Sequence, residues 1–131
     1  MKIGNYELHS VQTGLFRLDG GAMFGVVPKP LWSKTNPADD SNRIDMCMRS
    51  LLLVGNGKKI IIDNGAGYKL SDKLNAIYGM DHSKFTLEEE LIRHNIKPAD
   101  ITDVIWTQLH FDHADKKKKM AENGEIELAF P

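Results

Sequence analysis

The sequence predicts an α+β fold, a mixed β-sheet with helices on one face. Two apolar runs at residues 49–54 and 58–63 flank Gly55, Asn56 and Gly57. Asn-Gly between such runs is a strong hairpin signal because both residues tolerate positive φ. Two helical patterns and one further β-branched run follow this hairpin. Strands that precede helices, with another strand after them, indicate the mixed class.

Upstream of the hairpin, the pattern predicts strand and then irregular structure. Residues 6–18 alternate apolar and polar side chains and predict one or two strands with a break at Gly14. Residues 20–28 are apolar but rich in glycine, so we expect a packed loop there. Residues 29–45 combine proline with Asn and Asp, and we expect a long loop or lid.

Downstream of the hairpin, local signals mark helices and a strand. Residues 71–78 carry the apolar stripe of an amphipathic helix. Residues 86–89 form a capping-box sequence, which predicts that a second helix begins there and ends before Pro98. Residues 101–107 predict a strand, and residues 126–130 alternate in the same way.

The expected core follows from the apolar positions of these elements. Leu109 and Phe111 should also point inward, because they alternate with polar residues. The apolar runs of the hairpin are continuous, so we expect both of its faces to be covered. The predicted core residues are Leu51, Leu53, Ile60, Ile62, Leu74, Ile77, Leu91, Ile92, Val104 and Trp106.

Composition excludes several classes of protein. The chain has 131 residues with 17 Lys and Arg against 18 Asp and Glu, and its formal net charge is −1. Hydrophobic residues make up 41% and charged residues 27%, which is globular usage rather than that of a disordered chain. The balanced charge argues against a nucleic-acid or membrane-surface partner. Residues 116–119 are four lysines, which we interpret as a solvated turn or helix face, with phosphate binding as the alternative.

Two further observations concern the cellular compartment. Cys47 is the only cysteine, so the chain can form no internal disulfide. The N-terminus has no apolar segment typical of a secretory signal, and the apolar runs are far shorter than the roughly 20 residues of a membrane span. We expect one domain, residues 1–131, in the cytoplasm.

Metal-binding residue types are concentrated at the end of the last long predicted strand. In an extended chain, Gln108, His110 and Asp112 share one side, and His113 joins them only if the backbone turns. Two imidazoles and a carboxylate at this spacing favour a cation such as Zn²⁺. The alternative is a set of polar residues on an exposed loop.

These residues resemble the signature of the metallo-β-lactamase superfamily, His-x-His-x-Asp-His after a strand. Residues 107–114 match it except that Gln108 replaces the first His. The superfamily also places an Asp at the end of an earlier strand, and Asp63 fits that position. Residues 19–29 resemble the subgroup of lactonases and methyl-parathion-hydrolase-like enzymes. The resemblance spans residues 6–131 and implies half of an αββα sandwich.

The resemblance implies a binuclear zinc centre. His110 would bind the first metal, and Asp112 and His113 would bind the second. A hydroxide between the metals would attack a lactone, an ester or a phosphotriester, since bound Zn²⁺ lowers the pKa of water to about 7. On this basis Asp112 is both a metal ligand and a catalytic residue.

Residues around this centre receive roles from the same resemblance. Asp63 would orient a ligand or a loop by hydrogen bonding. The sequence equally allows Asp63 to cap the turn at residues 64–67. Met23 and Phe24 would contact a small-molecule substrate.

Three departures from the superfamily pattern bear on activity. Gln108 offers an amide oxygen, a much poorer zinc ligand than the imidazole it replaces. Asp115 and Lys116 replace the usual glycines after the motif. The later His and Asp ligands of the superfamily lie in a second half, and this chain ends after the first. We therefore expect three good ligands, partial or absent zinc occupancy, and impaired or no activity in the chain alone.

Two hypotheses of different classes follow. The chain is either a zinc hydrolase completed by a partner half, or a truncated or engineered half-domain that binds metal weakly or not at all. An uncovered sheet face would drive association, so we expect a homodimer. A nuclease ranks third because the net charge is −1.

Overall fold

A computed structural model describes residues 1–68, 70–115, 118–120, 126–128 and 130. The described elements, in chain order, are β1 (Lys2–Ile3), β2 (Tyr6–Asp19), α1 (Gly20–Phe24), α2 (Lys29–Trp32), β3 (Arg43–Gly55), β4 (Lys58–Ile62), α3 (Asp72–Tyr78), α4 (Leu87–Arg93), the 3-10 helix η1 (Pro98–Asp100), β5 (Asp103–Ile105), α5 (Phe111–Ala114), β6 (Lys118–Met120) and β7 (Ile126–Leu128).

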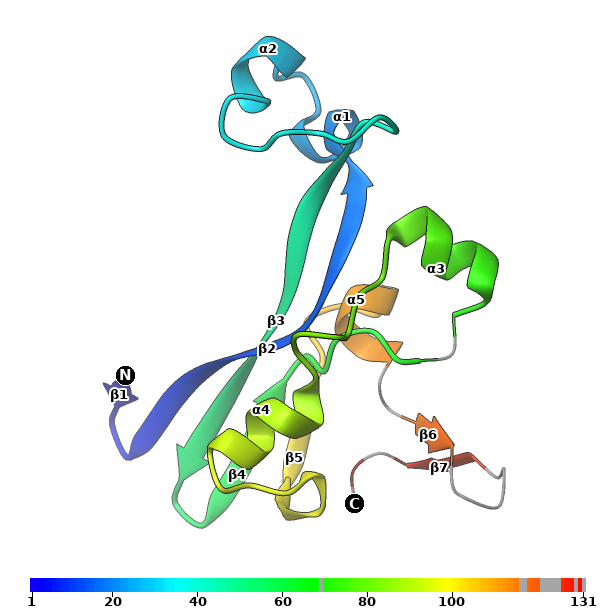
Figure 1. The fold of residues 1–131 in the computed structure, drawn as a ribbon. Coiled ribbons are helices and arrows are strands. Elements are labelled where there is room, and N and C mark those ends of the chain that lie inside the picture. The colour runs from blue at the N-terminus through cyan, green and yellow to red at the C-terminus, as the bar shows by residue number, and fades with distance from the viewer. Residues whose placement is uncertain (69, 116–117, 121–125, 129, 131) are drawn as a thin grey trace.

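A five-stranded sheet in the order β1-β2-β3-β4-β5 organises the fold. Its strands pair antiparallel except for β4 and β5, which pair in parallel, so the sheet is mixed. Helix α4 lies beside the sheet near β4 and β5 (Figure 1). The predicted α+β class is thereby confirmed. Strands β6 and β7 form a separate antiparallel pair.

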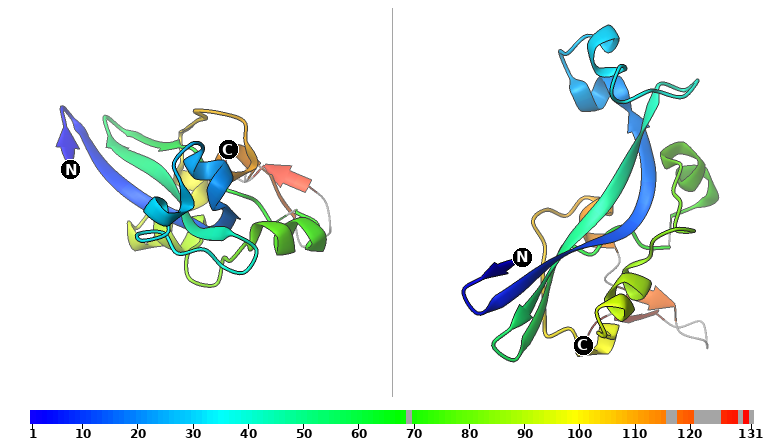
Figure 2. Two further views of the ribbon diagram at one scale, coloured as in Figure 1. Left: turned by 90° about the horizontal axis from the view of Figure 1, so that it is seen from above. Right: turned by 60° about the vertical axis from the view of Figure 1, so that its left-hand side comes forward.

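Strands β2 and β3 form a long ribbon that projects away from the rest of the sheet. Figures 1 and 2 show α1 and α2 at its far tip, well separated from α4 and β5. The strand register shifts between Gln12 and Gly14, which leaves one extra residue in β2. The break expected at Gly14 is therefore a bulge within one strand.

Two expectations for the tip are wrong. Residues 20–24 are helical, because the Asp19 carboxylate accepts a hydrogen bond from the Ala22 N–H at 2.7 Å and caps α1. The glycines of residues 20–28 had indicated a loop, and the capping role of Asp19 was not recognised from the sequence. The expected loop at 29–45 contains α2, and β3 already begins at Arg43.

The hairpin and the two later helices are confirmed. Asn56 and Gly57 adopt φ of 50° and 72°, as the turn between β3 and β4 requires. The Ser71 side chain caps α3, and the Thr86 hydroxyl accepts a hydrogen bond from the Glu89 N–H to cap α4. These caps are local, so a sequence pattern identifies them.

The core lies on one face of the sheet, and the hairpin residues predicted to form it lie on the other face. Leu52 and Ile61 are fully buried with Val11, whereas the expected Leu51 and Ile60 point to the opposite face. The cause is the continuous apolar run, which fits either face. Of the predicted core residues only Leu91 is fully buried; Leu51, Leu53, Ile60, Ile62 and Val104 are half-buried, and Leu74, Ile77, Ile92 and Trp106 are exposed.

The C-terminal part of the chain differs from expectation in detail. Strand β5 is shorter than the predicted 101–107. Residues 118–119 belong to a strand rather than to a helix face, while residues 116–117 lie outside the described residues. No helix in the described part of the chain is long and apolar enough to span a membrane. The single-domain and cytoplasmic assignments stay predictions.

Candidate metal centre

The turn after β4 presents a buried carboxylate to the motif. Asp63 adopts a left-handed φ of 58°, and its backbone N–H donates to the Ile105 carbonyl at 2.8 Å. Its carboxylate accepts from the backbone N–H and the hydroxyl of Thr107, at 2.8 and 2.7 Å. Asp63 thus bonds across to the segment that leads into the motif. A non-glycine residue in this conformation is typical of functional sites, where surrounding bonds hold it in place.

His113 is the third partner of Asp63. Helix α5 begins at Phe111, so the backbone turns within the motif and brings the His113 ring inward. The ring Nδ1 lies 2.8 Å from Oδ2 of Asp63, and Nε2 lies 3.3 Å from Oδ2 of Asp112. The imidazole is therefore held between two carboxylates that come from different elements.

Hydrogen bonds favour the ionised form of the Asp63 carboxylate. Burial raises the pKa of Asp63, but hydrogen bonds from His113 and Thr107 outweigh it, so the pKa lies below the ordinary 3.8. Nδ1 of His113 faces this carboxylate, and Nε2 faces the carboxylate of Asp112. A carboxylate behind the ring in this way would orient the imidazole if Nε2 bound a metal.

The distance between His113 and Asp112 fits a shared metal ion. Two ligands about 2.0–2.2 Å from a tetrahedral zinc are about 3.4 Å apart. The 3.3 Å between Nε2 and Oδ2 matches that separation. The donor set of one neutral imidazole and one carboxylate is also of the type that zinc accepts.

The structure does not add the remaining predicted ligands to this pair. Gln108 and His110 are exposed, and His110 lies in extended backbone just before α5. Across the described ranges, no group of three or more His, Cys, Asp or Glu side chains is placed to hold a metal. The structure thus brings together Asp112, His113 and Asp63 and leaves His110 apart.

The apolar residues of the motif differ from expectation. Leu109 is 78% exposed, because the chain does not continue as a strand at this point. Phe111 does pack inward, where it stacks on Tyr78 with ring centroids 4.6 Å apart and meets Phe16 edge-on. Phe111 therefore links the motif to α3.

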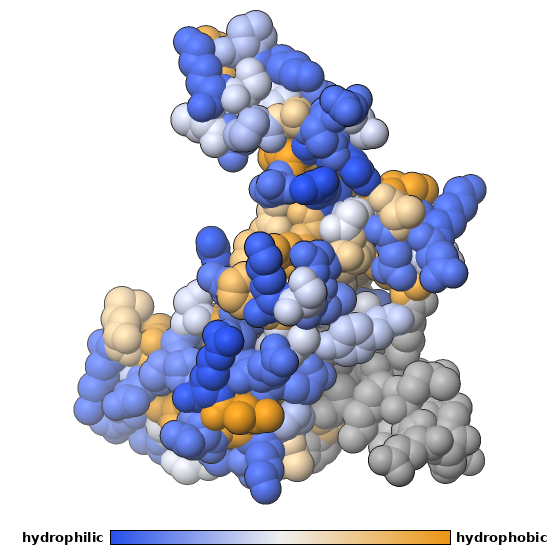
Figure 3. Space-filling view, in the orientation of Figure 1, coloured by the Kyte–Doolittle hydropathy of each residue, from blue (hydrophilic) through white to orange (hydrophobic). Residues whose placement is uncertain are grey.

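An apolar groove of about 300 Å³ lies between the ribbon tip and α3. Tyr78 and Ile77 form one wall, and Leu18, Ala22 and Met23 form the other. Figure 3 shows apolar surface at the narrow part below the tip and on the neighbouring α3. Met23 is thus available to a ligand, whereas the Phe24 ring stacks on Trp32 within the tip.

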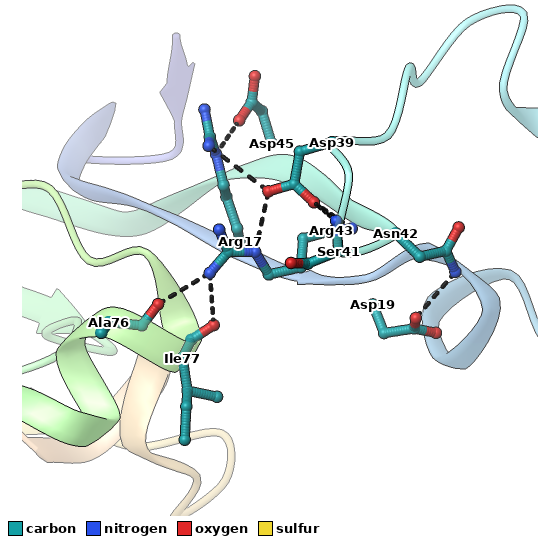
Figure 4. Close-up of polar contacts among 9 residues, drawn as sticks. All are labelled: Arg17, Asp19, Asp39, Ser41, Asn42, Arg43, Asp45, Ala76 and Ile77. Atoms are coloured by element: carbon teal, nitrogen blue, oxygen red, sulfur yellow. Dashed lines mark hydrogen bonds and ion pairs between the residues drawn. The ribbon is translucent and has the colours of Figure 1, made fainter.

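An arginine that the sequence analysis missed fixes α3 against the ribbon. Arg43 donates to the carbonyl oxygens of Ala76 and Ile77 at 2.8 and 2.9 Å, and it pairs with Asp39 at 2.9 Å (Figure 4). Arg17 pairs with the same Asp39. Positive charge at the C-terminal end of a helix also stabilises the helix dipole. Arg43 fell within the expected loop at residues 29–45, so no sequence pattern indicated this contact.

Comparison with known proteins supports the resemblance. No protein-family model and no curated protein matches the chain. A probable metal-dependent hydrolase from Staphylococcus aureus has 39% identity and a TM-score of 0.78 over 89% of this chain and 43% of that one. AidC, a dizinc quorum-quenching lactonase, has 21% identity and a TM-score of 0.66, and the match covers 100% of this chain and 41% of AidC. AbOPH, a hydrolase in the beta-lactamase superfamily, has 18% identity and a TM-score of 0.61, and the match covers 86% of this chain and 36% of AbOPH.

These structures confirm the fold inferred from the motif. The chain spans less than half the length of each of the three. It carries part of a metallo-β-lactamase fold, with the His-Asp-His motif at the end of a parallel strand pair.

Proposed function

We propose that the chain is part of a metal-dependent hydrolase in which Asp112 and His113 hold one zinc and His110 is a ligand of the other. The observation that carries this proposal is the Asp63–His113–Asp112 chain of contacts, at 2.8 and 3.3 Å. A carboxylate behind a metal-binding imidazole fixes the ring and raises its basicity. The similarity to a probable metal-dependent hydrolase at 39% identity supports the same reading.

The substrate class we propose is a lactone, an ester or a phosphotriester. A bound zinc ion supplies a hydroxide near neutral pH and polarises a carbonyl or phosphoryl oxygen. The chain's own residues supply orientation, since the Asp63 carboxylate holds the ring of His113 through Nδ1 and leaves Nε2 facing Asp112. The groove beside Met23 and Tyr78 suits an apolar group on the substrate.

We also propose that two copies of the chain associate through the face of the sheet opposite α4. Leu53, Ile60 and Ile105 lie on this face, and Ile105 is 49% exposed. Sedimentation should give a dimer that Ile105→Lys dissociates. Ile92→Lys is the control, since Ile92 is 60% exposed on α4 and lies on the other side. A wild-type monomer at high protein concentration contradicts the dimer.

One observation favours a second candidate, a half-domain without catalysis. Gln108 stands where the superfamily has a histidine, and His110 lies apart from Asp112 and His113. Such a chain keeps the fold and binds metal weakly or not at all.

Metal content separates the two candidates. The half-domain predicts partial or absent zinc occupancy, whereas the hydrolase predicts about one zinc per chain by elemental analysis of purified protein. His113→Ala should lose it, and His94→Ala, which changes a half-buried histidine at the end of α4, should keep it. Protein with zinc is then assayed on lactones, esters and phosphotriesters. Protein that binds no zinc when it is supplied in excess contradicts the hydrolase and supports the half-domain.

A further inference from the structure

Three polar side chains are buried behind the motif without partners. Asn64 and Thr13 are 0% exposed and Ser50 is 4% exposed. Both amide atoms of Asn64 and the two hydroxyl oxygens have no hydrogen-bond partner among the described residues. An unpaired buried polar group costs about 1–3 kcal/mol, so native proteins rarely leave several of them in one region.

The strand register places these groups in one region. Thr13 is the extra residue at the bulge of β2, and a Cβ on Gly65 would lie 2.4 Å from its hydroxyl oxygen. Ser50 precedes Leu51, which pairs with Ile62, so Ser50 lies beside the start of the turn that holds Asn64. Thr13 and Ser50 therefore lie next to the turn that carries Asn64.

The same turn holds His113 in two ways. The backbone N–H of Asn64 donates to the His113 carbonyl at 2.8 Å, and Asp63 binds the ring at the same distance. Gly65 also bridges to Ala114. A shift of the turn thus displaces both the backbone and the ring of His113.

We propose that Thr13, Ser50 and Asn64 enclose a buried water site that fixes this turn and, through it, the position of the His113 ring. A buried water makes about three hydrogen bonds to otherwise unsatisfied polar groups. The hydroxyls of Thr13 and Ser50 and the side-chain amide of Asn64 supply enough donors and acceptors for those three hydrogen bonds. The inference extends the proposed function, since it assigns these residues to the positioning of a metal ligand.

Nuclear magnetic resonance of the metal-free protein tests the site. We expect the side-chain amide protons of Asn64 to show cross-relaxation with a long-lived water. Ser50→Ala and Thr13→Val should weaken this signal. Ser10→Ala is the matched control, because Ser10 is an exposed serine that pairs with Leu51 on the other face. Resolved Asn64 amide signals without any water contact overturn the water site.

The ¹⁵N shifts of the His113 ring test the link to the motif. Ser50→Ala should move these signals away from their wild-type positions, because the ring is displaced, and Ser10→Ala should leave them in place. An unchanged ring in Ser50→Ala overturns the positioning role. Neither the water contact of Asn64 nor the His113 ring shifts require zinc. A chain that fails to bind zinc therefore contradicts the proposed function without deciding whether the water site exists.

Discussion

Oδ2 of Asp63 lies 2.8 Å from Nδ1 of His113, and the two residues are separated by 50 positions in the chain. Asp63 comes directly after β4, and His113 lies in α5, so the contact joins the end of the sheet to the motif. Thr107 supplies two further hydrogen bonds to the same carboxylate. The carboxylate thus makes three hydrogen-bond contacts, all with groups near the motif.

Replacing this carboxylate should weaken metal binding. Asp63→Asn keeps the shape but removes the negative charge that faces Nδ1 of His113. We expect zinc affinity to fall by about 10–100-fold, as for other residues behind metal ligands. Calorimetric zinc titration measures this. Asp100→Asn is the control, because Asp100 pairs with Lys59 and precedes β5, whereas the motif follows that strand. Equal affinities for both variants would contradict the role of Asp63.

Removing the Arg43 side chain should release α3. Arg43→Met keeps much of the apolar stem and loses the bonds to Ala76, Ile77 and Asp39. Hydrogen bonds from a charged group contribute about 1.5–3 kcal/mol, so we expect a loss of that size in the free energy of unfolding. Hydrogen exchange should speed up in α3 but not in α4. Arg49→Met, at an exposed position of the same strand, should change neither quantity.

Local signals allowed much of the fold to be predicted. The hairpin follows from Asn56 and Gly57, and the start of α4 follows from Thr86, because each signal acts on its immediate neighbours. The core phase could not be predicted in the same way. Three consecutive isoleucines at 60–62 offer an apolar side chain to each face, and only the packing of α4 selects Ile61.

The same contrast between local signals and long-range contacts applies to the candidate site. The resemblance to the superfamily indicated that Asp63 orients part of the motif, and the structure brings its carboxylate to His113. The metal-binding roles of Asp112 and His113 stay predictions. The contact of Arg43 with α3 spans 33 and 34 positions and leaves no periodic signal. The buried polar groups of Thr13 and Asn64 likewise depend on the bulge and on a left-handed turn, which side-chain patterns do not encode.

Acid should weaken the ribbon through Asp39. The backbone N–H and the guanidinium of Arg43 hold the pKa of Asp39 below 3.8, although burial opposes them. The lowered pKa means that ionised Asp39 contributes its full share to the stability of the fold above pH 3.8. This stabilisation is lost as the pH falls through the pKa that Asp39 has in the folded chain. Asp39→Asn should therefore melt below wild type at neutral pH, and the two melting temperatures should converge in acid. Asp40→Asn, at the exposed neighbouring position, should show no such convergence.

Adjacent isoleucines test which face of the sheet is the core. Ile61 is fully buried with Leu52 and Leu91, whereas Ile60 is half-buried on the opposite face. Ile61→Ala should lower the free energy of unfolding by about 2–5 kcal/mol, the range for a large side chain removed from a packed core. Ile60→Ala removes the same atoms from a half-exposed surface, so the loss should be less than half as large.

Chemical denaturation at low protein concentration measures both variants, so that any dimer is dissociated and Ile60 is judged in the single chain. Both variants replace Ile with Ala in β4, so the loss of strand propensity is the same for each. A larger loss for Ile60→Ala would place the core on the face that carries Leu51 and Leu53. The described packing of α4 against Val11 would then be wrong, and so would the choice of Ile105 as the site of contact between two copies.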